Sequence, residues 1–280
     1  MNDTKTRRVE VAEAIADLGY EGILSFDRAE PEYRAFSSLR EEFDNEPLLA
    51  LLGIGAGIID YQLAGDAQRF WQELEDTAIE YDSLEDIDDV ENILDTFADA
   101  DVNARFISAK QTRIEKLFEH GFADWFVDSY GMVAPLMVWE RLAETLDNAM
   151  DQKTVVFAMK VYDIVHLIVN DTYIDFPTRV PIPCNLHVRR MAEIAGIVAD
   201  TDDESVLQAW EKVASEVSML IGQDISLLRI DSIVWQSGQI VSDEELDADA
   251  SMAALVKHYT DLEIGHASAK NLAAELTWSL

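Results

Sequence analysis

Cysteine and histidine are scarce in this chain. The single cysteine, Cys184, excludes an internal disulfide and fits a reducing compartment. Five histidines are scattered along the sequence and form no cluster of zinc-type ligands with it. The acid-dense segment 80–101 keeps helical spacing of its apolar residues and lacks the central glycine of a Ca²⁺ loop. We therefore expect neither a metal nor a cofactor.

Long uninterrupted hydrophobic runs are also missing. The longest apolar stretch, Pro47–Ile59, contains three glycines and is too short to span a bilayer. Residues Met1–Lys5 lack the apolar core that a signal peptide carries. These features predict a cytoplasmic protein without a membrane-spanning segment.

Basic residues are few, with 21 Lys and Arg against 55 Asp and Glu and a net charge of −34. A charge of this sign ordinarily argues against nucleic acid, because phosphates repel it. The hydrophobic content of 49% excludes a disordered acidic chain. At multimolar salt the Debye length is about 3 Å or less, so the repulsion between acidic side chains is screened. The composition therefore predicts a protein adapted to a high-salt cytoplasm.

Helical periodicity runs through most of the chain, and no segment of useful length alternates as a strand does. Helices are predicted at 9–18, 31–42, 47–64, 67–79, 103–119, 132–148, 155–169, 203–221, 225–238, 251–262 and 267–277. The glycines in the apolar helix at 47–64 are expected to permit close helix packing. They do not form a phosphate loop, since no strand precedes them and no lysine follows. We expect an all-α fold.

One face of the helix predicted at 103–119 gathers basic residues. Its members are Arg105, Lys110, Arg113 and Lys116. At 100° per residue these four fall within about 140° of arc. Two interpretations stay open, namely a phosphate-facing surface and an ordinary solvated face with nearby glutamates as partners.

The segment 152–190 contains the starts of two predicted helices. Lys153 precedes the long apolar run, which offers both burial and a helix N-terminus to its amine. Pro181 and Pro183 favour an extended entry to the second helix, and Asn185 occupies the N-cap position. Because helix N-termini attract anionic groups, this segment is a candidate site for an anionic or polarised ligand.

Five segments of the chain occur in the order and spacing of one known family. They are E-P-E-Y-R-A at 30–35, D-Y-Q-L-A-G at 60–65 followed by Trp71, K-T-V-V-F at 153–157, P-I-P-C-N-L-H-V-R-R at 181–190 and R-I-D-S-I-V-W at 229–235. Together they resemble the archaeal 8-oxoguanine DNA glycosylases (AGOG type) of the helix-hairpin-helix base-excision superfamily. The resemblance covers roughly residues 9–240.

This resemblance implies a fold, an activity and a partner. The fold would be a two-lobed helix-hairpin-helix glycosylase-like unit over residues 1–280 with a central cleft. One lobe would comprise about 1–64 with 200–280, and the other about 65–200. The activity would be that of a DNA N-glycosylase and lyase that removes 8-oxoguanine through a lysine Schiff base. The partner would be damaged DNA, bound by a monomer, and the composition would make the source a halophilic archaeon.

The resemblance also implies the catalytic residues. Lys153 would be the nucleophile, and Lys160, seven residues on and on much the same helix face, is its local competitor. Asn185 stands where the family has an aspartate. An aspartate there would accept the proton of the attacking amine and stabilise the cationic sugar. An amide offers its dipole alone, although it caps a helix equally well.

The base pocket implied by the resemblance has five members. Phe157 and Trp235 would sandwich the flipped base, Trp71 would line the pocket, and Asp231 would hydrogen-bond the base. Glu32 stands where the family has a base-reading glutamine, and an ionised glutamate can only accept hydrogen bonds.

Three residues that follow Asn185 in the sequence would contact DNA phosphate. They are His187, Arg189 and Arg190. Because Asn185 and Glu32 depart from the family pattern, two alternatives stay open. One is a catalytically weak or silent damaged-DNA-binding homologue, and the other is a glycosylase with altered base specificity.

Overall fold

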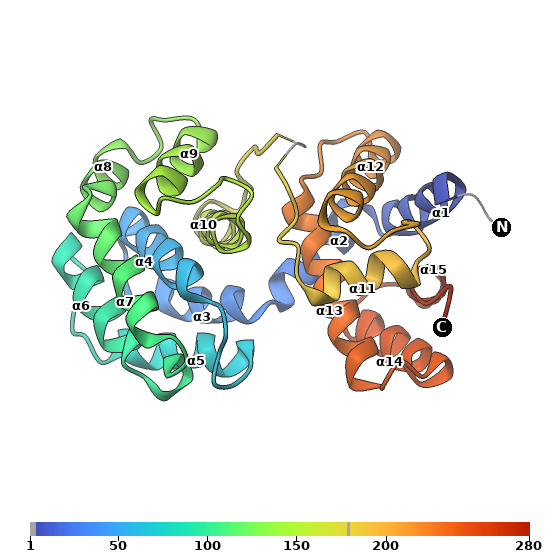
Figure 1. Ribbon diagram of the computed structural model, residues 1–280, viewed down its shortest axis with the longest axis horizontal. Helices are drawn as coiled ribbons and strands as arrows, with labels where there is room; N and C mark the ends of the chain where they lie inside the picture. Colours follow the sequence, from blue (N-terminus) through green and yellow to red (C-terminus); the bar gives the residue numbers. More distant parts are fainter. Residues whose placement is uncertain (1–3, 178–179) are drawn as a thin grey trace. The chain divides into compact units, whose positions relative to one another are not determined.

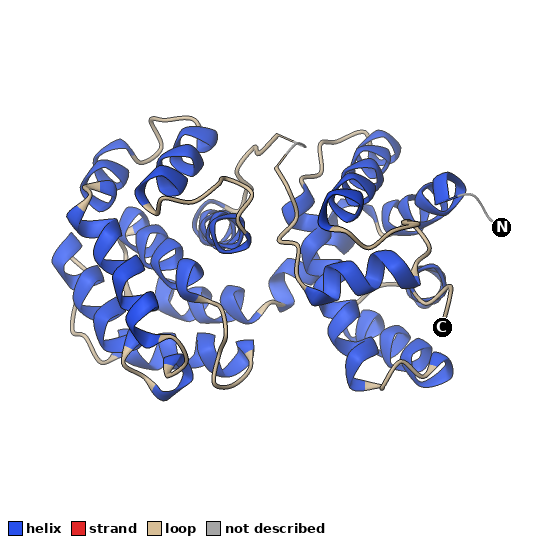
Figure 2. Cartoon of the chain, in the orientation of Figure 1, coloured by secondary structure: helices blue, strands red, loops and turns tan. Residues whose placement is uncertain are grey.

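The computed structural model describes residues 4–177 and 180–280, and all regular structure within them is helical (Figure 2). The all-α prediction is therefore confirmed. Among the helices of these two ranges, none is both long and apolar enough to cross a membrane. In chain order (Figure 1) the helices are α1 (Thr4–Ala16), α2 (Gly19–Ala29), α3 (Pro31–Glu42), α4 (Glu46–Ile59), α5 (Ala67–Ile79), α6 (Ile87–Ala98), the 3₁₀ helix η1 (Asp101–Asn103), α7 (Ile107–Glu119), α8 (Phe122–Ser129), α9 (Pro135–Thr145), α10 (Lys153–Asn170), α11 (Leu186–Ile194), α12 (Asp203–Ile221), α13 (Leu227–Asp243), α14 (Ala248–Asp261) and α15 (His266–Leu276).

Some helix boundaries agree with the sequence prediction and others do not. Helices α3, α5 and α12 have the predicted limits. Two helices, α2 and α8, were not predicted. Gly19 and Gly121 stand at their N-terminal ends with positive φ angles of 66° and 69°. In each case the glycine turns the chain sharply and a new helix follows at once, whereas the sequence reading took Gly19 as a helix end.

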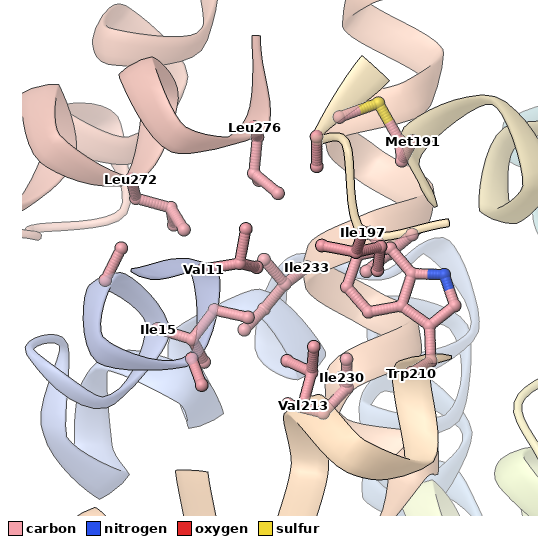
Figure 3. Packing of buried hydrophobic residues seen from close by; sticks show 14 of the residues in the cluster. Val11, Ile15, Met191, Ile197, Trp210, Val213, Ile230, Ile233, Leu272 and Leu276 are labelled. Carbon is pink, nitrogen blue, oxygen red and sulfur yellow. The ribbon is translucent and has the colours of Figure 1, made fainter. Parts of the chain in front are cut away.

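Unit 1 consists of Met1–Ala29 and Pro177–Leu280. Its hydrophobic core draws side chains from α1, α11, α12, α13 and α15, which meet in Figure 3. Helix α11 contributes Val188 and Met191, both fully buried. These apolar side chains fix α11, and with it the loop that precedes it, to unit 1.

Unit 2 consists of Glu30–Phe176 and is organised around the packing of α4 against α10. A Cβ atom at Gly57 would lie 2.7 Å from the Ala158 Cα, so the two backbones approach closely there. Farther along, Gly53 faces Val161. The residue numbers therefore run in opposite directions, and the end of α4 lies beside the start of α10. The expectation that these glycines permit close packing is confirmed.

The two units have other boundaries than the lobes implied by the resemblance, about 1–64 with 200–280 and about 65–200. Helices α3 and α4 belong to unit 2 because they pack against α10. Helix α11 belongs to unit 1 because it packs against α12 and α13. The chain thus passes from one unit to the other next to Glu30 and next to Pro177.

The basic residues of α7 do not form one solvated face. Lys110 is fully buried, and its Nζ donates a hydrogen bond of 2.8 Å to the Asn103 Oδ1. Arg113 donates to two groups of unit 2, and Lys116 pairs with Asp147 at 2.8 Å. The phosphate-facing interpretation is therefore wrong for Lys110, whose amine stabilises the interior of unit 2.

Candidate active site

Lys153 is the first residue of α10, and its side chain is exposed. The preceding residue, Gln152, makes no side-chain cap, so no cap from it occupies the first N–H groups of the helix. Lys153 forms no hydrogen bond or ion pair with any residue that the structure describes. The predicted place at a helix N-terminus is confirmed, whereas the expected burial of this lysine is wrong, because the apolar run after it faces the core without covering it.

Lys160 differs from Lys153 in every one of these respects. It is buried, and its Nζ lies 3.1 Å from the Glu30 Oε1 and 3.9 Å from the Glu32 Oε1. Both carboxyl groups are themselves 2% exposed. Lys160 is therefore an internal cation held between two carboxyl groups of the segment that leads into α3.

Glu32 lies farther from Lys160 than Glu30 does. Burial raises the pKa of Glu32 well above its usual range, and the negative charge of Glu30 raises it further, while Lys160 lowers it. Two buried carboxyl groups beside one lysine favour one negative charge, and Glu30 is the closer partner. Glu32 therefore keeps its proton to a higher pH than an ordinary glutamate does, and a protonated carboxyl both donates and accepts hydrogen bonds.

An aromatic group adjoins these charges. Trp71 is buried, and its ring centroid lies 6.3 Å from that of Phe157 and 6.1 Å from that of Phe36. The Lys160 Nζ lies 5.9 Å from the centroid of the Phe157 ring. Unit 2 thus brings together three predicted pocket residues, Glu32, Trp71 and Phe157, around Lys160.

Two buried polar atoms of this group have no hydrogen-bond partner among the described residues. They are the Trp71 Nε1 and the Glu32 Oε1. A buried donor or acceptor without a partner is destabilising, and such atoms are few in folded proteins. A polar ligand that entered this part of unit 2 would give both atoms a partner.

Asp60 follows the last residue of α4 and is half-buried. Burial raises the pKa of Asp60 to about 6. Three lysines oppose that rise, in the order Lys153, Lys110 and Lys160. Asp60 is therefore a carboxyl group that responds electrostatically to the amine of Lys153.

Unit 1 carries the second predicted catalytic residue. Asn185 is the N-cap of α11, and its Oδ1 accepts hydrogen bonds from the backbone N–H groups of His187 at 2.8 Å and Val188 at 3.0 Å. The predicted N-cap is confirmed. The amide oxygen is therefore engaged by the helix that it begins.

Three other predicted residues of unit 1 lie where α11 meets α13. The ring centroids of His187 and Trp235 are 6.4 Å apart in an edge-to-face arrangement. A Cβ atom at Gly238 would lie 2.7 Å from the His187 Cβ, so this glycine permits the close approach of the two helices. Arg190 donates a hydrogen bond to the Ser242 hydroxyl.

The remaining predicted residues of unit 1 are Arg189 and Asp231. The Arg189 guanidinium pairs with Asp203 at 3.0 Å on the surface, where such a pair contributes little and can open to a phosphate. Asp231 is 2% exposed on α13, so it is an internal carboxyl group and not a surface acid. The phosphate contacts of His187, Arg189 and Arg190 stay predictions.

Three site residues were missed by the sequence reading. Glu30 and Asp60 lie inside quoted segments but received no role, and Lys160 was noted only as a competitor of Lys153. A lysine within an apolar helix requires a buried counter-charge, and that signal indicates a carboxyl partner without identifying it. Across residues 4–177 and 180–280 no three His, Cys, Asp or Glu side chains converge as metal ligands would.

This sequence is similar to those of one family of known proteins. A family model described as AGOG, N-glycosylase/DNA lyase, matches residues 12–271. An N-glycosylase/DNA lyase of Thermococcus kodakarensis is 24% identical over 229 residues, which cover 81% of this chain and 82% of the relative. One of Pyrobaculum aerophilum is 23% identical over 237 residues, which cover 82% and 86%.

A solved structure shares the fold. It is that of the 8-oxoguanine DNA glycosylase from Pyrobaculum aerophilum complexed with 8-oxoguanosine, and it superposes with a TM-score of 0.73 at 20% identity. The superposition covers 98% of this chain and 97% of that one. The helical architecture therefore corresponds over almost the whole length of both proteins.

Proposed function

Since the chain belongs to the AGOG family of N-glycosylase/DNA lyases, we propose that it removes 8-oxoguanine from DNA through a Schiff base on Lys153. The family membership makes the protein a DNA glycosylase and lyase of base-excision repair. The damaged base, the nucleophile and the covalent intermediate are the proposed parts.

The observation that carries the nucleophile assignment is the contrast between the two lysines of α10. Lys160 is buried and held by two carboxyl groups, so its amine is occupied. Lys153 is exposed at the helix N-terminus without an ion pair among the described residues. An attacking amine must reach a sugar carbon and lose a proton, and Lys153 meets the first requirement.

The chemistry conserves atoms and charge in two stages. The neutral Lys153 amine forms a bond to the sugar C1′, the bond from C1′ to the base breaks, and the base departs with that electron pair and takes up a proton. The amine nitrogen then loses a proton, the bond from C1′ to the ring oxygen opens, and that oxygen is protonated. The product is a cationic imine; loss of a proton from C2′ then forms a C2′–C3′ double bond, and the 3′ phosphate leaves with the C3′–O electron pair, which cleaves the strand.

The group around Trp71 supports recognition of an extruded base. An extruded base requires stacking surfaces and polar contacts along its edge. Phe157 and Trp71 supply aromatic surface, and the Trp71 Nε1 and the Glu32 Oε1 are polar atoms that await partners. The neutral Glu32 carboxyl would donate one hydrogen bond and accept another, as the amide of glutamine does. Asp231 and Trp235, which belong to unit 1, stay predicted contacts of the base.

The test is covalent trapping in the presence of borohydride. The protein is incubated with a duplex that contains 8-oxoguanine in multimolar KCl, and the adduct is resolved by denaturing electrophoresis. Lys153→Arg should abolish the adduct, because a guanidinium stays protonated at neutral pH and is not a nucleophile. Lys160→Arg is the matched control, since it keeps the internal positive charge and should retain the adduct.

Each outcome decides between the candidates. Loss of the adduct in Lys160→Arg but not in Lys153→Arg would contradict the nucleophile assignment. Specific binding of the 8-oxoguanine duplex without any adduct would favour the silent damage-binding homologue. An adduct with another damaged base in place of 8-oxoguanine would favour altered base specificity.

A further inference from the structure

Position 185 lacks the carboxylate that would accept a proton during attack by Lys153. Its occupant, Asn185, is neutral, and its Oδ1 already accepts two backbone hydrogen bonds of α11. A primary amide is almost non-basic and cannot take up the proton that the lysine must release. If Lys153 acts as proposed, another group must take this proton.

The end of α4 is fixed beside the start of α10 by one guanidinium. The Arg113 Nη1 donates to the Ile58 carbonyl oxygen at 3.0 Å and to the Thr154 Oγ1 at 2.7 Å. Ile58 is two residues before Asp60, and Thr154 directly follows Lys153. The side chains of Asp60 and Lys153 therefore project from two segments that the Arg113 Nη1 links by hydrogen bonds.

Cations of α7 hold the segment that carries Asp60. The next residue, Tyr61, lies with its ring centroid 5.2 Å from the Arg113 guanidinium and 5.3 Å from the Lys110 Nζ. Burial lowers the pKa of Lys110 to about 8, and the charge of Asp60 opposes that fall. The loop after α4 is thus held against Lys110 and Arg113 of α7, and this contact fixes the position of the Asp60 backbone.

We propose that Asp60 supplies the carboxylate that this chain lacks at position 185 and accepts the proton that Lys153 loses. The proposal rests on the proposed role of Lys153 as nucleophile. Lysine carries its amine on a flexible four-carbon stem, so the exposed Lys153 can turn toward the end of α4. In the free protein such catalytic contacts are commonly longer than in the complex with substrate.

The ionisation of Asp60 suits this task. A proton acceptor works best when its pKa lies near the working pH, and the pKa of Asp60, raised by burial to about 6, does so. Above that pH the carboxylate can accept the amine proton as the C1′ bond forms. It can then pass that proton to the departing base, and a proton from solvent is taken up by the sugar ring oxygen when the ring opens.

Several charged groups bear on Asp60 and enter its pH dependence. They are Lys153 and Lys160 on α10, Lys110 on α7, Glu32 on α3, and Arg113, which contacts the neighbouring Tyr61. The three lysines favour the carboxylate, whereas burial favours its neutral form. The charge of Asp60 in turn raises the pKa of Glu32. The cleavage rate of the wild-type protein should therefore rise with pH through about 6.

The experiment measures single-turnover cleavage of an 8-oxoguanine duplex in multimolar KCl as a function of pH. Asp60→Asn should lower the rate by about 10²–10⁴-fold and remove the rise near pH 6. Asp60→Glu should retain part of the activity and the rise. Asp124→Asn, an exposed acid on α8 in the same unit, is the control for loss of one negative charge and should match the wild type.

A second pair of variants separates proton transfer from a purely structural role. Asn185→Asp returns a carboxylate to the family position and should restore the rate of Asp60→Asn at least tenfold. Lys110→Met removes the buried cation that Asp60 faces, so it should restore the thermal stability of Asp60→Asn without restoring its rate. If Lys110→Met restored the rate as well, Asp60 would merely neutralise Lys110 and the proposal would be wrong.

The results distinguish this proposal from the proposed function. If the wild-type protein forms no borohydride adduct with the duplex, the proposed function fails first. If the wild type forms the adduct through Lys153 and folded Asp60→Asn cleaves with an unchanged rate and pH profile, the role of Asp60 is refuted while that of Lys153 stands.

Discussion

Two buried carboxyl groups share the cation of Lys160, and this arrangement predicts a graded response to three substitutions. Lys160→Met leaves Glu30 and Glu32 buried without their cation, and it should lower the free energy of unfolding by about 3–5 kcal/mol. Glu30→Gln should lower it less, because Glu32 can take up the charge that faces Lys160. Glu32→Gln should change it by about 1 kcal/mol or less at a pH of about 5, because Glu32 is already neutral.

The distances set the order of the two glutamates. The Lys160 Nζ lies 3.1 Å from the Glu30 oxygen and 3.9 Å from the Glu32 oxygen. At an effective dielectric constant of about 20, the nearer contact is stronger by about 1 kcal/mol. That difference places the negative charge on Glu30 and the proton on Glu32, and it is also the extra loss expected when Glu30→Gln moves the charge to the farther carboxyl.

The pH dependence of the free energy of unfolding tests the protonation of Glu32 independently. Burial and the charge of Glu30 raise the pKa of Glu32 in the folded protein above its unfolded value, so folding takes up a proton between the two. The free energy of unfolding of the wild type then falls as pH rises through this window, by up to about 1.4 kcal/mol per pH unit. Glu32→Gln removes this contribution, so the variant should gain stability relative to the wild type as pH rises.

Urea denaturation followed by circular dichroism, at constant multimolar KCl and at several values between about pH 5 and 8, measures both effects. The difference between Glu32→Gln and the wild type cancels the titration of all other groups. A difference that stays flat with pH would refute the neutral state of Glu32. So would a loss in Glu32→Gln at a pH of about 5 as large as that in Lys160→Met.

Three further predictions concern the cap, the helix crossing and the salt dependence. Asn185→Ala should lower the free energy of unfolding by about 0.5–2 kcal/mol, whereas Asn185→Asp keeps the N-cap and should leave it nearly unchanged, as thermal denaturation would show. Gly57→Ala should lower the free energy of unfolding by about 1–3 kcal/mol, because the added Cβ would lie 2.7 Å from the Ala158 backbone. Gly53→Ala should lower it less, because its Cβ would meet only side-chain atoms at 3.1 Å or more. Equal effects of the two substitutions would contradict this prediction. The net charge of −34 should make the melting temperature fall as KCl is lowered from multimolar to about 50 mM, and an unchanged melting temperature would refute adaptation to high salt.

Local signals in the sequence were enough to predict most of the helices and one cap, but not α2 and α8. Asn185 after Pro183 predicted an N-cap because a short polar side chain satisfies free N–H groups whatever lies farther away. The glycines of α4 predicted close packing because a glycine in an apolar helix has few other uses. These features depend on neighbours within a turn or two of the chain, so one sequence suffices to find them.

Charge placement could not be predicted in the same way. Lys160 and Glu30 are 130 residues apart, and only the packing of α3 against α10 brings them together. Lys110 shares a helical face with other basic residues, yet its own side chain is buried and donates to Asn103. The environment of Asp60 likewise depends on the antiparallel crossing of α4 and α10. Periodicity shows which residues share a face and leaves open what that face meets.

Mass spectrometry of the trapped wild-type complex tests whether Lys153 forms the covalent bond to DNA. The borohydride adduct with an 8-oxoguanine duplex is digested with protease and nuclease, and the modified peptide is sequenced. We expect a nucleotide remnant on Lys153. A remnant on Lys160, on another lysine or on the N-terminal amine would contradict it.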